Sequence, residues 1–239
     1  MANFVWDQNF ELNVARGKMR GARSIHKFGA VSSLSGNTTG TVWDVNDQLY
    51  PWGEFDGGAI TLTIESDPAD AGKNIRILGL DADYNEQLED ITLDGTATQT
   101  STLQFIRVYR GFCEQQLAED VNILSPTPTI VMRITAEANQ TLMAVYTIPA
   151  GLTGYLRQGT ATAQGGAEAT GFMKVRFGGQ EAFNVGHTFE VVGNGGQYFY
   201  KFPYYVKIPE KSDIDVIVRA RSNNGRFTAA FDVLLLVEA

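Results

Sequence analysis

Short runs in which apolar and polar residues alternate recur along the chain from residue 59 onward. In the first run, AITLTIES at 59–66, the residues Ile60, Leu62 and Ile64 share one face at the two-residue period of a half-buried strand. Further runs are NIRILGL, LEDITLDG, TLQFIRVYRGF, TIVMRIT, LMAVYTIPAGLTGYL, GFMKVRFGG, GHTFEVVG, GQYFYKFPYYVKI, DIDVIVRAR and RFTAAFDVLLLVEA. Turn signals such as SDPADAG, DADYNE and SPTPT separate them. This spacing predicts sandwiches or barrels rather than alternating βα units.

The division into domains follows from the length and from a change near Ala138, where one series of strands ends and another begins. A chain of 239 residues suits one large β domain or two small ones. The sequence predicts an all-β fold of two antiparallel β-sandwich domains, of jelly-roll or immunoglobulin-like type, at 41–137 and 138–239. Residues 114–121 are the one candidate for a short helical turn, and the Asn-Gly pair within 222–226 predicts a hairpin.

Residues 1–40 differ from the rest of the chain in charge and in pattern. They carry five basic and two acidic residues, a net charge of +3, which leaves −11 for the remainder of a chain whose total is −8. No apolar period lasts there, so we predict an extended arm. Two interpretations stay open: a solvated tail, or an arm that orders against an acidic neighbouring subunit. In both, deleting residues 1–27 is expected to leave the domains folded. The candidate interface residues of the arm are Arg16, Lys18, Arg20, Arg23 and Lys27.

The acidic composition excludes several classes of partner. A net charge of −8 and an isoelectric point near 4.8 disfavour nucleic acid, whose binding needs many Lys and Arg residues. The longest apolar run, VLLLV at 233–237, is too short to cross a bilayer, and the first residues show no secretory signal. Because Cys113 is the single cysteine, an internal disulfide is excluded, which is consistent with assembly in a reducing cytoplasm. We therefore expect no nucleic acid and no membrane as partners.

The segment GLDADYNEQLEDITLDGT at 79–96 raises the question of a metal site. Asp81, Asp83 and Asn85 have the spacing that opens a calcium-binding loop. Such a loop needs Gly at its sixth position and Glu at its twelfth, where this chain has Glu86 and Thr92. The sequence therefore predicts a hairpin turn, because Asp and Asn bond nearby backbone amides. Weak binding of a cation to this oxygen-rich loop stays open.

The sequence contains few candidate catalytic or metal-binding residues. Two histidines, His26 and His187, and one cysteine cannot form the usual four-ligand zinc site without carboxylates, and no GxSxG or GxxxxGK[ST] signature occurs. Asp213 and Asp215 lie two apart at the start of a predicted strand, where they should share a solvent-exposed face. We therefore expect no catalytic residue, no metal, no cofactor and no enzymatic activity.

An aromatic cluster at 198–205 has two possible roles. In a strand, one alternate set of side chains packs into the core, and the other forms a subunit interface, where Tyr and Phe are enriched. Tyr198, Tyr200 and Tyr204 are the candidate interface residues of this cluster. A platform for carbohydrate is the alternative.

Four groups of turn and strand-end residues occur in a fixed order over 58–157. They are Gly79-Leu80-Asp81, Leu93-Asp94-Gly95-Thr96, Arg107 with Arg110, and Ile148-Pro149-Ala150-Gly151 followed by Tyr155-Leu156. In this order the segment resembles virion structural proteins of tailed bacteriophages, particularly those of marine and cyanobacterial phages. Residues 113–121 depart from the resemblance, since CEQQLAEDV stands where related proteins usually have a Gly/Asn-rich loop.

The resemblance implies a non-enzymatic component of a virus particle, located in the virion and assembled in the host cytoplasm. The leading hypothesis is a capsid decoration (cement) protein that stabilises the head through subunit–subunit contacts. Its partners would be copies of itself, with a trimer compatible with closed-particle symmetry, and other virion proteins such as the major capsid protein. Two alternatives stay open: a tail or head–tail connector component, and a receptor- or glycan-binding module.

Overall fold

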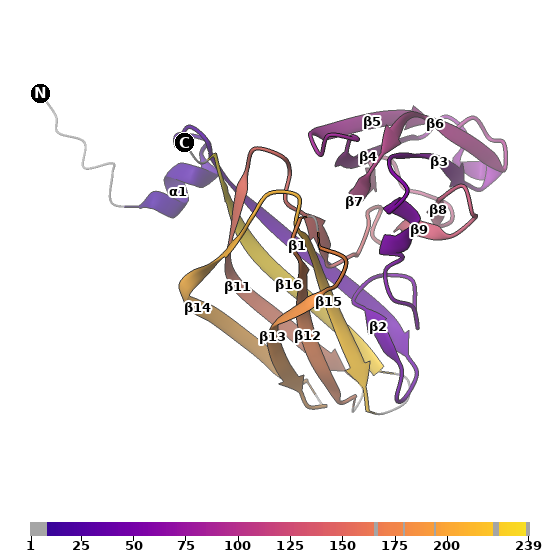
Figure 1. Cartoon of the computed structure of the whole chain (residues 1–239). Helices are drawn as coiled ribbons and strands as arrows, with labels where there is room; N and C mark the ends of the chain where they lie inside the picture. The colour runs from indigo at the N-terminus through magenta and orange to yellow at the C-terminus, as the bar shows by residue number, and fades with distance from the viewer. Residues whose placement is uncertain (1–8, 165–166, 179, 194, 222–224, 238–239) are drawn as a thin grey trace, which may run out of the picture.

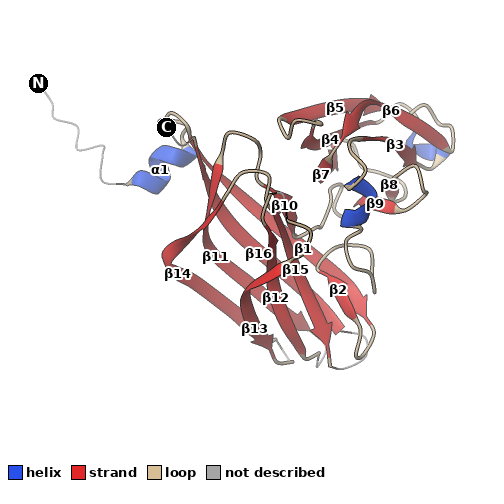
Figure 2. Cartoon of the chain, in the orientation of Figure 1, coloured by secondary structure: helices blue, strands red, loops and turns tan. Residues whose placement is uncertain are grey.

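A computed structural model describes residues 9–164, 167–178, 180–193, 195–221 and 225–237. Figure 1 and Figure 2 show that nearly all regular structure is strand, which confirms the predicted all-β class. The strands form two units joined side by side. Each unit has a hydrophobic core of buried side chains, and the core of the larger unit also includes Leu80, Ile106 and Tyr109 from the smaller unit.

The larger unit is a sandwich of two antiparallel sheets. The first sheet has the order β1 (Ala22–Leu34), β16 (Gly225–Leu236), β11 (Thr153–Gln164) and β14 (Gln197–Ile208). In the second sheet, β15 (Asp213–Ala220) lies between β12 (Ala169–Arg176) with β13 (Asn184–Val191) on one side and β2 (Thr39–Thr41) with β10 (Val145–Thr147) on the other. This order and the alternation of the chain between sheets are those of a jelly roll. We call it the jelly-roll unit.

One edge strand of the jelly-roll unit is made of two separate pieces of chain. β2 pairs with Ile217–Arg219, and β10 pairs with Asp213–Asp215 on the same side of β15. Between them, Val42 N–H donates to Val216 O (2.8 Å) and Val216 N–H donates to Ala144 O (3.2 Å). Residues 43–143 therefore leave the sheet in the middle of a strand and return to continue it.

These residues form the second unit, which we call the inserted unit. One of its sheets has the order β6 (Thr98–Phe105), β3 (Ile60–Glu65), β8 (Val121–Leu124) and β9 (Ile130–Ile134). The other has the order β5 (Glu86–Thr92), β4 (Asn74–Leu80) and β7 (Arg107–Cys113). Two short 3-10 helices, η1 (Trp52–Phe55) and η2 (Pro68–Asp70), complete it. Its inward positions Ile75, Ile77, Leu62 and Ile64 are fully buried, as the alternation predicts.

Gly29 is required where β1 crosses the edge strand made of β2 and β10, which we call the split strand. A Cβ atom at this position would lie 2.1 Å from Val42 O and 2.4 Å from Ala144 N. These are backbone atoms held by the pairing with β15, so they cannot move aside. Only glycine allows β1 to pass this closely over the point where the inserted unit begins and ends.

The prediction of an extended arm is wrong for residues 22–34, which form β1 and pair with β16 from Ala22↔Leu236 to Leu34↔Gly225. The inward-facing positions of β1 include Lys27 and Gly29, so the apolar period that marks the other strands is broken here. Ahead of β1 lies a short helix, α1 (Phe10–Ala15), in which Leu12 N–H donates to the capping Asn9 Oδ1 at 3.0 Å. The boundaries near 41 and 138 stay predictions, although the jelly-roll unit takes two strands from the predicted arm.

Other local predictions have mixed outcomes. In β16 the alternate residues from Phe227 to Leu235 are buried as expected, but Val237 is 60% exposed. Residues 114–121 contain no helix, and β8 begins at Val121. The predicted hairpin at 222–226 includes 222–224, which lie outside the described residues. The strands on either side of this segment, β15 and β16, belong to different sheets.

Deleting residues 1–27 should therefore destabilise the protein, contrary to the expectation from the sequence. The deletion removes Ala22–Lys27, which pairs with Phe231–Leu236 of β16. We expect the free energy of unfolding to fall by about 3 kcal/mol or more, measured by urea unfolding. The control is deletion of residues 1–8, which leaves every described strand intact and should change stability by no more than about 0.5 kcal/mol. Equal stability of the two truncated proteins would show that the first half of β1 contributes nothing.

Candidate assembly surface and the junction between the two units

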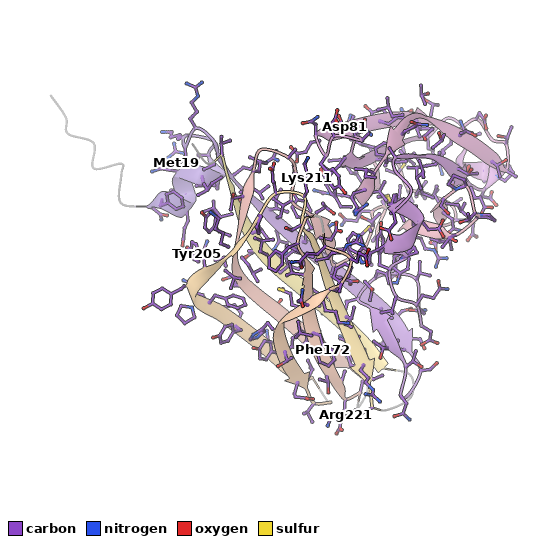
Figure 3. All side chains as sticks on the ribbon, in the orientation of Figure 1. Met19, Asp81, Phe172, Tyr205, Lys211 and Arg221 are labelled. Carbon is purple, nitrogen blue, oxygen red and sulfur yellow. The ribbon has the colours of Figure 1, made fainter. Side chains whose placement is uncertain are left out.

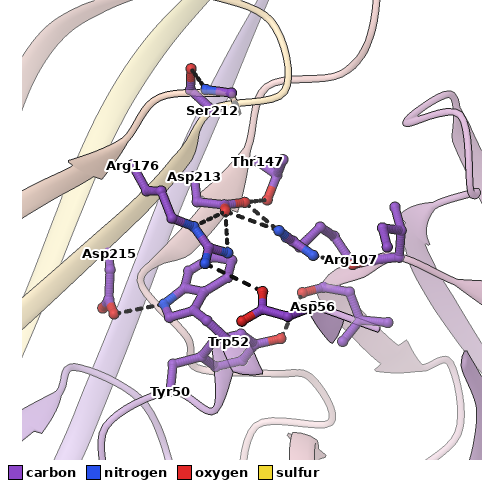
Figure 4. Close-up of polar contacts among 12 residues, drawn as sticks. Tyr50, Trp52, Asp56, Arg107, Thr147, Arg176, Ser212, Asp213 and Asp215 are labelled. Carbon is purple, nitrogen blue, oxygen red and sulfur yellow. Dashed lines mark hydrogen bonds and ion pairs between the residues drawn. The ribbon is translucent and has the colours of Figure 1, made fainter. Parts of the chain in front are cut away.

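The carboxylate of Asp213 joins the two units. Asp213 is the first residue of β15 and is 1% exposed. Arg107 of the inserted unit donates from Nε to Oδ1 (2.9 Å) and from Nη2 to Oδ2 (3.1 Å). Arg176 of β12 donates to Oδ2 from Nε (2.9 Å) and Nη2 (2.7 Å), and Thr147 Oγ1 donates to Oδ1 at 2.6 Å. Figure 4 shows the carboxylate between the two guanidinium groups. Every lone pair of this buried charge is therefore used.

Aromatic rings and a second carboxylate surround the two arginines. The guanidinium carbon of Arg107 lies 5.6 Å from the ring centroids of Trp52 and Tyr84, and that of Arg176 lies 5.6 Å from Trp52. Asp56, which is exposed, approaches Arg176 Nη1 at 3.4 Å. Two cations thus meet two anions, and the ring faces add cation–π attraction to the two largely buried guanidinium groups.

Asp215 extends the same junction toward η1. Trp52 Nε1–H donates to Asp215 Oδ2 at 2.9 Å, and Thr41 Oγ1 donates to Oδ1 at 3.0 Å. Burial raises the pKa of Asp215 to about 6, against these two hydrogen bonds, which lower it. The prediction that Asp213 and Asp215 are exposed is wrong, because β15 is a central strand and the inserted unit covers its first residues. The sequence carries no signal for Arg176 as the partner of Asp213.

The acidic segment forms the predicted turn between β4 and β5. Asp81 Oδ1 accepts from the backbone N–H of Asp83 (2.9 Å) and of Asn85 (2.8 Å), and Tyr84 has a positive φ of 67°. The hairpin prediction is therefore confirmed. Among the described residues, no three His, Cys, Asp or Glu side chains are grouped as metal ligands. Arg23 at the start of β1 pairs with Glu86 at 2.5 Å, so basic and acidic segments meet within one chain.

The five basic candidate residues do not share one environment. Three of them follow α1 and are exposed: Arg16, Lys18 and Arg20. Arg23 forms an ion pair with Glu86. Lys27 is 6% exposed, and its ammonium donates to the backbone carbonyl of Tyr109 in the inserted unit. Lys27 therefore belongs to the contact between the units and cannot reach a neighbouring subunit.

The aromatic candidates divide between two sides of β14. Tyr198 Oη and His187 Nε2 are 2.5 Å apart, and the His187 ring stacks on Tyr200 with 4.8 Å between centroids. These rings close the side of the sandwich where β13 and β14 are the edge strands. Tyr204 is 90% exposed and contributes nothing to that cluster.

A four-residue bulge in β14 explains the exposure of Tyr204. The register with β11 pairs Leu156 with Val206 and Gln158 with Lys201, so residues 202–205 lie opposite one residue of β11. The bulge contains Pro203, which lacks an N–H for strand pairing, and β14 is an edge strand. The bulge pushes the side chain of Tyr204 outward and prevents simple edge-to-edge pairing at this point.

Exposed apolar side chains gather on the side of the molecule that carries α1 and β14. Of the thirteen large hydrophobic residues exposed among the described residues, nine lie on α1, the turn after it, β14 or the described C-terminal end. They are Phe10, Leu12, Met19, Phe199, Tyr200, Tyr204, Tyr205, Val206 and Val237. Figure 3 shows Met19 and Tyr205 on this side, away from Asp81 in the inserted unit. We call these nine residues the apolar surface, although Tyr200 also stacks on His187, and exposed apolar side chains on neighbouring elements mark a candidate interaction site.

Comparisons with known proteins do not assign a family. No family model matches the chain, and no curated protein matches it. A solved structure of the cowpea mosaic virus top component, a naturally occurring empty particle, aligns with 8% identity and a TM-score of 0.25, over 76% of this chain and 86% of that one. The subviral particle of infectious bursal disease virus VP2 aligns with 10% identity and a TM-score of 0.23, over 91% and 71%. Scores this low establish no common fold, so the jelly-roll assignment rests on strand order. No described helix has the length and apolarity to span a membrane.

Asp213→Ala should strongly destabilise the junction. The substitution leaves Arg107 and Arg176 buried without their shared anion, which we expect to lower the free energy of unfolding by about 3–5 kcal/mol. Asp56→Ala is the matched control, because Asp56 is exposed and its loss should lower stability by less than about 1 kcal/mol. Urea unfolding of both variants measures the difference. Similar small losses in the two variants would contradict a central role for Asp213.

Lys27 should give the stability a dependence on alkaline pH. Burial and the nearby charge of Arg110 lower the pKa of Lys27 to about 7, although Asp44 acts in the opposite direction. The charged form is therefore unfavourable in the folded protein, and stability should rise as pH increases from about 7 toward 10. In Lys27→Met this rise, about 1.4 kcal/mol per pH unit at most, should disappear. Lys201→Met, at an exposed position, should keep the wild-type slope in urea unfolding at pH 7 to 9.5, and a Lys27→Met profile parallel to it would contradict the burial argument.

Proposed function

We propose that this protein is a non-enzymatic structural component of a virus particle, and specifically a capsid decoration protein of a tailed bacteriophage. The observation that carries the proposal is the apolar surface on α1 and β14, because a folded domain with this much clustered apolar side chain needs a partner. The jelly-roll strand order supports it, since this architecture recurs in viral capsid domains. The resemblance over residues 58–157 points to the same class of protein.

The proposed mechanism is repeated surface complementarity. The buried Asp213 network holds the inserted unit rigidly against the jelly-roll unit, so one subunit presents two fixed contact surfaces. The apolar surface binds like subunits, and the inserted unit with its acidic hairpin faces other virion proteins such as the major capsid protein. Each bound copy then stabilises the particle by mass action, and the gain depends on occupancy.

A glycan-binding module is the second candidate, favoured by one observation. Tyr204 is 90% exposed and Tyr205 next to it is 41% exposed, and jelly rolls also occur in lectins. A binding role predicts that Tyr204→Ala abolishes adsorption of particles to host cells without changing particle composition. The decoration role predicts the reverse, with reduced incorporation and unchanged adsorption per particle.

Particles of the virus that encodes this chain provide the test. We expect the protein in purified particles at a copy number on the order of hundreds, distributed over the head surface, because a decoration protein follows the symmetry of the shell. Quantitative mass spectrometry and cryo-electron microscopy measure both quantities. A copy number equal to one closed ring at the head–tail joint would make it a connector component instead. Complete absence of the protein from purified particles would overturn the structural role.

A further inference from the structure

The side of the molecule that carries the apolar surface is also basic. The turn after α1 and the strand β14 contribute five exposed basic residues and no acidic one: Arg16, Lys18, Arg20, Lys201 and Lys207. We call these five residues the basic rim. Two acidic residues on this side, Glu11 and Asp232, already form ion pairs with Arg157 and His26. Positive charge and exposed aromatic rings therefore lie together, and a partner that fits them has an acidic surface.

The inserted unit carries most of the negative charge of the chain. Residues 43–143 hold 5 Lys and Arg residues against 17 Asp and Glu residues, a net charge of −12. Because the whole chain has a net charge of −8, the remainder carries +4. Four of the five basic residues already pair with a carboxylate: Lys73 with Asp70, Arg76 with Asp90, Arg107 with Asp213 and Arg133 with Asp120. The excess of acidic residues is therefore not compensated within the inserted unit.

Two loops of the inserted unit bring some of these acidic residues together. The loop between β7 and β8 packs against the turn after β9, because Ala136 N–H donates to Asp120 Oδ1 (2.9 Å) and Gln116 Nε2 donates to Ala136 O (2.8 Å). Glu119 and Glu137 flank this contact and are exposed, and within the described part of the chain neither forms an ion pair. We call Glu119, Asp120 and Glu137 the acidic end of the inserted unit.

The basic rim and the acidic end cannot meet within one chain. In Figure 1 the inserted unit lies on one side of the jelly-roll sheets, and α1 and β14 lie on the other. The buried ion pairs of Asp213 with Arg107 and Arg176 hold the inserted unit in this position. A contact between the two surfaces therefore joins two copies and is heterologous. A twofold axis that brings two basic rims together would oppose like charges, which is unfavourable.

We propose that the apolar surface, with its basic rim, binds the acidic end of the inserted unit of a second copy. Opposite charge orients the two copies, and the exposed rings supply area that is buried at the contact. Repetition of the contact closes a ring or continues as a lattice, according to the rotation between neighbours. The acidic hairpin at 81–85 is not part of this contact. The inference rests on the proposed structural role and names the partner of the apolar surface as the inserted unit of a second copy.

Reversing the charge of each surface in the full chain tests the contact. One double variant combines Arg20→Glu with Lys201→Glu, and the other combines Glu119→Lys with Glu137→Lys, all at exposed positions. Each should raise the dissociation constant of self-association at least about tenfold in sedimentation analysis, because like charges then face each other. An equimolar mixture of the two variants should associate nearly as well as the wild-type chain, since each reversed surface finds its complement on the other variant.

Two comparisons separate this contact from a general effect of net charge. The variant with two new lysines brings the net charge of the chain closer to zero, which by itself favours association, whereas the proposed contact requires weaker association. Arg219→Glu with Arg226→Glu is the matched control for the basic rim. Both residues are exposed and lie close in sequence to Arg221, which Figure 3 shows far from Met19. This control changes the net charge equally and should leave the dissociation constant unchanged.

Salt gives a measurement that needs no variant. Raising NaCl from about 0.1 M to about 1 M shortens the screening length from about 10 Å to about 3 Å, so association of the wild-type chain should weaken at least about tenfold. Three results overturn the inference: a wild-type chain that stays monomeric at every concentration, association that salt leaves unchanged, and a mixture of the two reversed variants that associates no better than either alone.

The fate of the proposed function is read separately, from purified particles. A protein that is present in particles but whose association ignores these charges retains the structural role and loses this contact. A protein that is absent from particles but whose reversed variants restore each other retains the contact alone.

Discussion

The buried carboxylate of Asp213 is the interaction on which the arrangement of the two units depends. An unpaired charge in this position would be prohibitively unfavourable, and here five hydrogen bonds from Arg107, Arg176 and Thr147 compensate its desolvation. The three donors come from the inserted unit, β12 and β10, so the carboxylate can be satisfied only when both units are docked. Docking and folding of the split strand are therefore coupled through one side chain.

The split strand gives this coupling its geometric basis. The chain leaves its pairing with β15 at Val42 and resumes it at Ala144. Gly29 of β1 passes over this gap with no room for a side chain. Both connections of the inserted unit are thus anchored in one ladder, which restricts rotation of the unit about its ends. In Figure 1 the inserted unit lies to the right of the jelly-roll sheets, while α1 and β14 lie on the opposite side. The junction and the apolar surface lie on separate sides of the molecule. Contacts made by one side therefore need not distort the other.

The local alternation of apolar and polar residues predicts most of the strands, but it predicts little of the junction around Asp213 or of the apolar surface. The alternation in NIRILGL and in the strand from Phe227 to Leu235 is complete, and these strands lie where the sequence predicts them. β1 was not predictable, because Lys27 and Gly29 occupy inward positions for reasons set by the inserted unit: one donates to Tyr109 O, and the other leaves room for the split strand. The exposure predicted for Asp213 and Asp215 was wrong for the same cause, since their partners lie far away in sequence. The sequence predicted Tyr204 as an interface residue, which agrees with its exposure, but it did not predict the bulge that projects its side chain.

By itself the sequence determined the all-β class, the turn at Asp81–Asn85 and the absence of a disulfide, because each follows from residues close together in the chain or from a count. Only the tertiary structure decided that the supposed arm completes a jelly roll, that Arg23 and Lys27 are used within the chain, and that two aspartates hold two units together. The physical reason is the range of the interactions. Turn chemistry acts over a few residues, whereas strand pairing across a sheet and the satisfaction of a buried charge join residues separated by most of the chain.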